Sequence, residues 1–265
     1  MSSIATSHPT VPLVGGGHTV PLWRVLRAEL QDELRAIYRE PAALGFSVLM
    51  PVAFFALFVN IFGGQGGDPT EAGTGMLAAF GTFGVLSVTL MNPGIGLAAD
   101  RERGWLRVKR VAAVPFSVTV AAKLLAAVPY SVGVLTAMTG TAAVMGRLDV
   151  TGTGVLRLLV VLIIGAGAFV PIGLAVGSLA SSTASAAILN AILLPMAITS
   201  GLWMPLEVLP DWIGGLAPAM PAYHLSQLAQ AQLAGGGGWE HALALVATLI
   251  VGAGLFASAY RRSRP

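Results

Sequence analysis

Six long apolar runs divide the chain, and each is long enough to be a membrane-spanning helix. A helix of about 20 mostly apolar residues crosses a hydrocarbon core of about 30 Å. The runs occupy residues 44–62, 76–99, 121–145, 155–179, 185–206 and 241–260. Buried helices of a soluble protein are the alternative, but six such runs within 265 residues argue against it. We therefore expect an all-α membrane protein with six transmembrane helices.

Charge is scarce and unevenly placed. Only 10% of residues are charged, whereas a soluble domain has about 25%. Four of the 15 Lys and Arg residues lie between residues 21 and 40, six lie between the second and third runs or at the edge of the third, and three follow the last run. Because cytoplasmic loops carry the excess of Lys and Arg, both termini are expected in the cytoplasm. The basic residues are thereby explained without nucleic acid as a partner.

The segments outside the spans have distinct characters. Residues 1–20 are predicted to be a flexible cytoplasmic tail, whose His8 and His18 have no carboxylate or cysteine nearby to complete a metal site. Residues 21–40 place leucines at helical spacing among charged residues, which predicts an amphipathic helix lying in the membrane interface. Residues 261–265 form a second cytoplasmic tail. Lys123 and Arg147, at the ends of the third span, are expected to extend their charges to the interface.

A basic segment that contains a tryptophan, residues 100–114, separates the second and third spans. Its fifteen residues would form about 22 Å of helix, which is more than a simple turn requires. Trp105 and Val108 can share one face, with Arg103, Arg107 and Arg110 on another. One interpretation is a basic loop that serves only to orient the chain in the membrane. The other is a helix that docks a cytoplasmic protein.

Three stretches together resemble the ATP-binding-cassette type-2 permeases. DRERGWLRVKR (100–110), followed by Pro115, is similar to the cytoplasmic coupling helix of that family. Residues 38–64 resemble its first span, with Arg39, Pro41 and Pro51 at the expected places. Residues 200–233 resemble its broken extracellular hairpin before the last span. The resemblance covers about residues 21–260 and implies a six-span permease domain over residues 41–260.

The resemblance implies a membrane subunit of an ATP-driven exporter in the bacterial cytoplasmic membrane, working by alternating access. This chain would bind no cofactor, and two separate nucleotide-binding ATPase subunits would use ATP and Mg. A second permease chain, identical or paralogous, and membrane lipid would be its other partners. Drug- or antibiotic-like substrates are favoured, and lipid or glycolipid export is the alternative. The residues expected to dock the ATPase are Asp100, Arg101, Glu102, Arg103, Gly104, Trp105, Arg107 and Val108.

Polar and proline-rich positions suggest a translocation path through the membrane and a gate at its extracellular end. Residues 207–240 hold several prolines, which break helices, and non-helical backbone at membrane depth needs protein or a water-filled cavity to cover it. The candidate gate residues are Pro205, Pro210, Trp212, Pro221 and Tyr223. The candidate path residues are Asn92, Asn190, Thr199 and Trp203, although Asn190 and Thr199 serve equally well as contacts between helices.

The sequence motifs argue against an enzyme. The chain holds no phosphate-binding loop, no HExxH or GxSxG motif and no cysteine. No span carries a carboxylate at its middle, which a proton-coupled carrier would often need. An ATP-independent channel or a membrane scaffold is the remaining alternative from another class.

Overall fold

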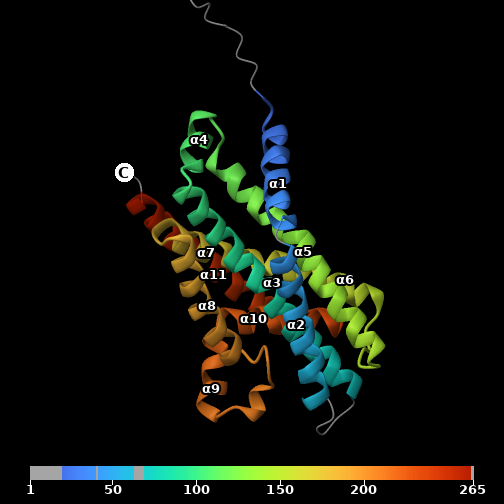
Figure 1. Ribbon diagram of the computed structural model, residues 1–265. Coiled ribbons are helices and arrows are strands. Elements are labelled where there is room, and N and C mark those ends of the chain that lie inside the picture. Colours follow the sequence, from blue (N-terminus) through green and yellow to red (C-terminus); the bar gives the residue numbers. More distant parts are fainter. Residues whose placement is uncertain (1–19, 40, 63–68, 264–265) are drawn as a thin grey trace, which may run out of the picture.

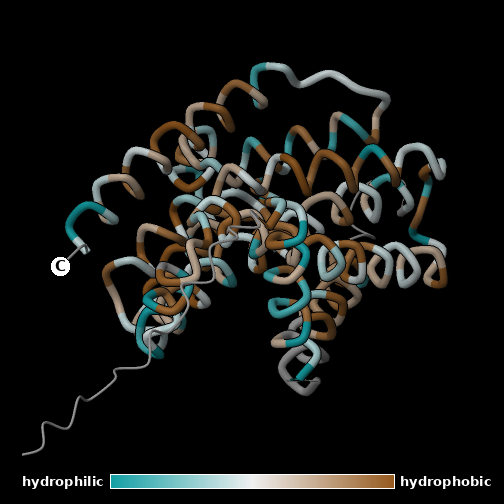
Figure 2. Tube along the Cα trace, turned by 90° about the horizontal axis from the view of Figure 1, so that it is seen from above, coloured by the Kyte–Doolittle hydropathy of each residue, from teal (hydrophilic) through white to brown (hydrophobic). Residues whose placement is uncertain are grey.

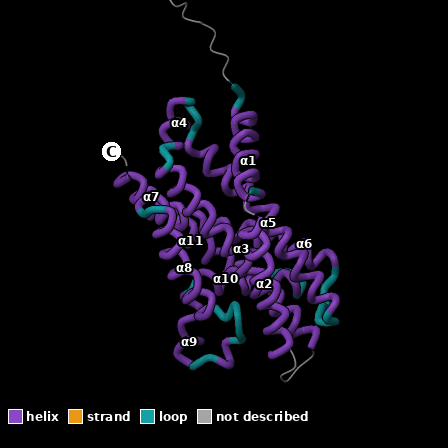
Figure 3. Tube along the Cα trace, in the orientation of Figure 1, coloured by secondary structure: helices purple, strands orange, loops and turns teal. Residues whose placement is uncertain are grey.

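The computed structural model describes residues 20–39, 41–62 and 69–263, and every regular element within these ranges is helical (Figures 1 and 3). The predicted all-α class is therefore confirmed. In chain order the elements are α1 (Leu22–Tyr38), α2 (Pro41–Phe62), α3 (Pro69–Glu102), α4 (Trp105–Val111), α5 (Phe116–Val144), α6 (Gly152–Ala166), η1 (Gly167–Phe169), α7 (Val170–Leu179), α8 (Ser182–Thr199), η2 (Leu206–Val208), α9 (Asp211–Leu216), η3 (Ala217–Ala219), α10 (Pro221–Leu233) and α11 (Trp239–Ser263).

Each of the six predicted spans coincides with an apolar helical segment. In the described part of the chain, five segments are long and apolar enough to cross a membrane, and the apolar stretch Val48–Phe62 of α2 is shorter. The five are Thr70–Glu102, Phe116–Val144, Gly152–Leu179, Ser182–Thr199 and Trp239–Ser263. Hydrophobic residues occupy the greater part of these helices (Figure 2). The chain is a multi-pass membrane protein.

The two ends of the helical bundle differ. α4, the start of α1 and the last turn of α11 lie at one end, and α9 lies at the opposite end (Figure 1). Both ends of the described chain are thus on the same side as α4. α3 is the central helix, since it packs against α2, α5, α7, α8 and α10. Its buried side chains, among them Phe80, Leu86 and Leu90, form the middle of the hydrophobic core.

The helix expected over residues 100–114 is shorter than predicted. Asp100, Arg101 and Glu102 are the last turn of α3, and the new helix α4 comprises only the seven residues from Trp105 to Val111. Gly104, with a φ of +71°, turns the chain between them. A residue with a Cβ is disfavoured in this left-handed conformation, so glycine here separates the two helices.

The fifth span also ends earlier than the predicted residue 206. α8 stops at Thr199, where the amide of Leu202 donates to the carbonyl of Ala197 and that of Gly201 donates to Ile198. This pair of bonds, with Gly201 at a φ of +70°, is a Schellman motif, which terminates helices. The fourth span is interrupted by the 3-10 turn η1 just before Pro171, because proline has no amide hydrogen to continue the α-helical bonding.

The packing of α3 on α7 depends on glycine. A Cβ added to Gly173 would collide with the carbonyl oxygen of Leu90, and one added to Gly177 would collide with the carbonyl oxygen of Gly94. Small residues let helices approach closely in a membrane, where van der Waals packing rather than water exclusion holds them together. Gly173 and Gly177, which form a GxxxG motif in the fourth span, therefore serve close helix packing within this chain.

Replacing Gly177 by alanine should destabilise this contact. We expect Gly177→Ala to lower the melting temperature of the detergent-solubilised chain, since overpacking costs about 1–3 kcal/mol. Gly140→Ala on α5 is the control, because nothing lies within 4 Å of an added Cβ there. Alanine should leave stability unchanged at that position or raise it slightly. Equal melting temperatures for the two variants would contradict the proposed close contact.

Candidate functional site

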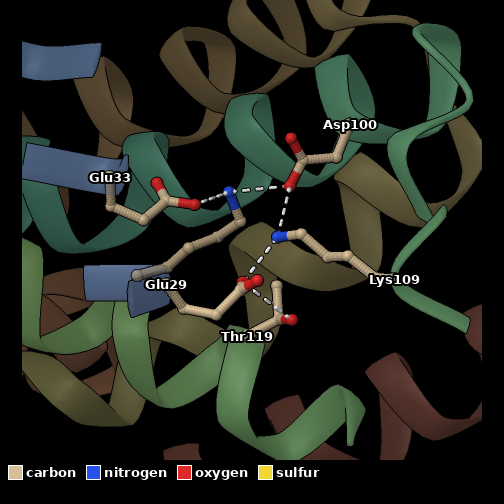
Figure 4. Close-up of polar contacts among 6 residues, drawn as sticks. Glu29, Glu33, Asp100, Lys109 and Thr119 are labelled. Carbon is tan, nitrogen blue, oxygen red and sulfur yellow. Dashed lines mark hydrogen bonds and ion pairs between the residues drawn. The ribbon is translucent and has the colours of Figure 1, made fainter. Parts of the chain in front are cut away.

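Five ionised side chains from four helices meet beside α4 (Figure 4). Nζ of Lys109 on α4 lies 2.6 Å from Oε2 of Glu29 on α1, and Nζ of Lys123 on α5 lies 2.6 Å from Oε1 of Glu33, also on α1. Oδ2 of Asp100, in the last turn of α3, lies 3.1 Å from the Lys123 ammonium and 3.8 Å from that of Lys109. We call these five residues the ionic cluster.

Helical spacing brings the members of the ionic cluster together. Glu29 and Glu33 are one turn apart on α1, so both face α5, against which α1 packs. Thr119 and Lys123 are likewise one turn apart on α5, and the Thr119 hydroxyl donates to the Glu29 carboxylate at 3.2 Å. Gly96, one turn before Asp100, leaves the space that the Lys123 ammonium occupies.

The ionic cluster is largely shielded from solvent. The Lys123 side chain is only 4% exposed. The most exposed side chain of the ionic cluster is that of Glu33, at 23%. Burying a charge is costly unless an opposite charge compensates it, and each ammonium here contacts two carboxylates. Lys123 does not extend into solvent but turns inward, because Glu33 and Asp100 offer it two anionic partners.

The two residues after Asp100 fix the junction between α7 and α8. The Arg101 guanidinium donates to the carbonyls of Ser178 and Ala180 at the end of α7, the second at 2.7 Å. The Glu102 carboxylate accepts from the amide of Ser182 at 3.1 Å and from its hydroxyl at 2.7 Å. A cation at a helix C-terminus and an anion at a helix N-terminus are both stabilising, so α3 positions both helix ends.

α4 presents one apolar face outward. Trp105 and Val108, three residues apart, are 46% and 51% exposed, and Arg103 and Arg107 beside them are also exposed. Leu106 and Lys109 point the other way, into a small apolar cluster and the ionic cluster respectively. α4 is thus anchored on one side and open on the other.

The eight predicted docking residues consequently fall into two groups. Asp100, Arg101 and Glu102 contact other parts of this chain, and Gly104 makes the turn. The second group, Arg103, Trp105, Arg107 and Val108, is exposed, and Glu102 of the first group is exposed as well. The structure therefore offers a smaller surface for a partner than the sequence suggested.

The predicted path and gate residues are more dispersed. Asn190 and Thr199 donate to the carbonyls one turn before them, Ala186 and Pro195, and Asn92 is exposed on α3. Pro210 precedes α9, Trp212 is exposed on it, and Pro221 begins α10. Tyr223 contacts the rings of His224 and His241. Of all these candidates, Trp203 and Pro205 line one common cavity near the outer hairpin.

Sequence reasoning missed most of the ionic cluster. Glu29 and Glu33 were assigned to no site, although their spacing matches that of Leu26, Leu30 and Leu34 on the same half of α1. That shared spacing is the one signal that would have placed them on the packed face. Lys109 lay inside the basic segment but was not distinguished from its exposed neighbours.

Metal ligands do not gather in the described part of the chain. No group of three or more His, Cys, Asp or Glu side chains there is arranged to hold a metal ion. His8 and His18 of the N-terminal tail lie outside the described residues. His224 and His241 do meet, with their Nδ1 atoms 2.9 Å apart, but as a pair only.

The fold and the site define a multi-pass α-helical membrane protein with a short, firmly anchored helix exposed at one end. Its family follows from comparison with known proteins. Residues 24–233 match the family of ABC-2 type transporters, and the chain belongs to that family. A relative from Bacillus subtilis (strain 168), the "Putative transport permease YvfS", is 24% identical over 228 residues, covering 86% of this chain and 93% of the relative. The protein is thus a transport permease, a membrane subunit of the ABC-2 type.

Neutralising one lysine of the ionic cluster should destabilise the protein. Removing one partner of a buried ion pair costs about 3–5 kcal/mol, so Lys123→Met should markedly lower the melting temperature. Adding Asp100→Asn should recover part of the loss, because the double variant restores the original balance of charge. The control is Arg262→Met, at an exposed position near the end of α11. A Lys123→Met variant as stable as this control would contradict the conclusion that the ionic cluster stabilises the fold.

Proposed function

We propose that this permease is the membrane subunit of an ATP-driven exporter, and that α4 docks the ATPase. Permeases of this family normally work with ATPase partners. The observation that carries the proposal is the outward face of α4, where Trp105 and Val108 stand among exposed arginines. Tryptophan and arginine are the residues most enriched at energetically important interface positions.

The rest of the proposed assembly follows from the family and from charge. Two ATPase chains, using ATP and Mg, would serve two permease chains, which are identical or paralogous. The end of the bundle that carries α4 and both described termini would face the cytoplasm, since most Lys and Arg residues lie there. The membrane would be the bacterial cytoplasmic membrane.

The ionic cluster supports a mechanical role for α4. α4 has only seven residues, too few to be stable alone, and Lys109 ties it to α1 and α3. When nucleotide draws the ATPases together, a displacement of α4 would pass to α1, α3 and α5 through these contacts. Alternating access would then follow from a tilt of the linked helices, and the proposed cargo is a hydrophobic or amphipathic, drug-like molecule.

The docking proposal is tested by changing only the exposed face of α4. Trp105→Ala with Val108→Ala should reduce recovery of a P-loop ATPase with the tagged chain about tenfold or more, since truncating a central interface tryptophan costs about 2 kcal/mol or more. The measurement is a gentle-detergent pull-down from native membranes with quantitative mass spectrometry. Scrambling all of residues 100–114 would be less informative, because it would also remove Asp100 and Lys109 from the ionic cluster.

The matched control is Trp239→Ala, which removes another exposed tryptophan at the start of α11. It should leave the recovered ATPase unchanged. A well-folded wild-type chain recovered without any P-loop ATPase would contradict the proposal and favour a channel or a scaffold.

A further inference from the structure

A pair of histidines joins α10 to the last span. Nδ1 of His224, near the start of α10, lies 2.9 Å from Nδ1 of His241, near the start of α11. The centroids of the two rings are 5.2 Å apart. Because the last turn of α11 lies at the α4 end of the bundle, its first turn lies toward the opposite end (Figure 1). In the proposed orientation the pair is therefore on the outer side of the protein.

The hydrogen-bond partners of the two rings fix the positions of their hydrogens. Nε2 of His224 lies 2.9 Å from the carbonyl oxygen of Pro218. A carbonyl oxygen can only accept, so Nε2 of His224 carries a hydrogen. In a neutral ring Nδ1 is then an acceptor, and Nδ1–H of His241 donates to it. The Nε2 atom of neutral His241 is left without a hydrogen, 3.8 Å from Oε1 of Glu240.

This contact is compatible with one additional proton but not with two. The first can bind Nε2 of His241, beside the Glu240 carboxylate, and it leaves the bond between the Nδ1 atoms intact. The second would have to bind Nδ1 of His224, which is the acceptor of that bond. Both Nδ1 atoms would then be donors, and two cationic rings would face each other at 2.9 Å. The rings must therefore separate.

The surroundings of the pair offer little to offset a second positive charge. Both histidines lie near helix N-termini, where the helix dipole disfavours a cation. The Tyr223 ring contacts both imidazoles nearly at right angles, with centroids 5.6 and 6.2 Å away. On the described helices that pack against α10 and α11, no charged group besides Glu240 forms an ion pair or hydrogen bond with either ring; these other groups are Glu71, Asp100, Arg101 and Glu102 of α3, Arg157 of α6, and Arg261 and Arg262 of α11.

Solvent can supply these protons. Both rings are only partly buried, and the His241 side chain is 20% exposed. Histidine is the side chain whose charge ordinarily changes between about pH 5 and 8. The contact therefore contributes stability at neutral pH that is lost when both rings become charged as the pH falls.

We propose that His224 and His241 form a proton-binding site that controls how firmly α10 is held to the last span. With no additional proton or with one, the pair holds the start of α10 against the start of α11. A second proton breaks the contact and releases the start of α10. The inference rests on the proposed function only for the side of the membrane that the pair faces, because proton binding requires no ATPase.

A double-mutant cycle tests whether the two rings are coupled in this way. Its members are the unmodified chain, His224→Ala, His241→Ala and the double variant, each solubilised in detergent without ATPase. Melting temperatures are measured from about pH 8 down to about pH 4.5. At the upper end the two substitutions together should lower the melting temperature by less than the sum of their single effects, because either one alone removes the contact. At the lower end this non-additivity should be lost.

A second measurement reports the separation directly and keeps both histidines. The chain has no cysteine, so Ala219→Cys and Leu249→Cys place spin labels at exposed positions of η3 and α11. Ala219 should move with the start of α10, since His224 binds the carbonyl of the adjacent Pro218. In nanodiscs, pulsed electron paramagnetic resonance should show a reversible lengthening of this distance on acidification. The same labels in the His224→Ala, His241→Ala background are the matched control, whose distance should not depend on pH.

Four results would overturn the proposal: additive effects at the upper pH, equal non-additivity at both ends of the range, a label distance that does not change, or an equal change in the control. The spin-label measurement decides the matter even if an alanine variant fails to fold. None of these results affects the ATPase pull-down, and a failed pull-down would not alter the cycle. The two proposals can therefore fail separately.

Discussion

Two ammonium groups and three carboxylates are held together at the junction of α1, α3, α4 and α5, and the placement of α4 depends on them. These charges are stable away from water only while each has its partners. α4 is too short to hold its own position, and Lys109 is the side chain that joins it to both α1 and α3. The exposed face of α4 is thus presented at a fixed angle to the bundle.

The last turn of α3 extends this connection further. Asp100 belongs to the ionic cluster, while Arg101 and Glu102 bind the facing ends of α7 and α8. α8 leads in turn to Ser200 and Trp203 in the wall of the cavity near the outer hairpin. A contiguous set of polar contacts and helices therefore runs from the exposed face of α4 to the opposite end of the protein. Such a path is a physical route by which a displacement of α4 would reach the opposite end of the protein.

The sequence predicted the features that depend on local pattern. Apolar runs predicted the five helices long enough to cross a membrane and the shorter apolar helix of α2, because a spanning helix must present apolar residues over its whole length. The ends of the spans were less well predicted. Gly201 terminates α8 through its left-handed conformation, but the sequence stays apolar after Gly201, so hydrophobicity alone did not indicate this end. Trp105 and Val108 were correctly placed together, because three residues make nearly one helical turn.

The ionic cluster could not be predicted in the same way. Glu29 and Lys109 are 80 residues apart, and Glu33 and Lys123 are 90 apart, so their pairing follows from tertiary packing alone. The side chain of Lys123 at a span end could extend into solvent or be shielded from it, and only the approach of α1 decides between them. The cavity near the outer hairpin is equally non-local, since α3, the end of α8 and α10 each supply part of its wall.

The most direct test is whether α1 and α4 move as one body when the proposed ATPase partner binds nucleotide. In this cysteine-free chain, spin labels at Arg27→Cys and Arg107→Cys report the separation of α1 and α4, and labels at Arg107→Cys and Trp212→Cys report that of α4 and α9. Distances would be measured by pulsed electron paramagnetic resonance on the complex with its ATPase, with and without ATP. The account predicts that the first distance stays constant while the second changes. A change in the first distance while the ionic cluster is intact would contradict it.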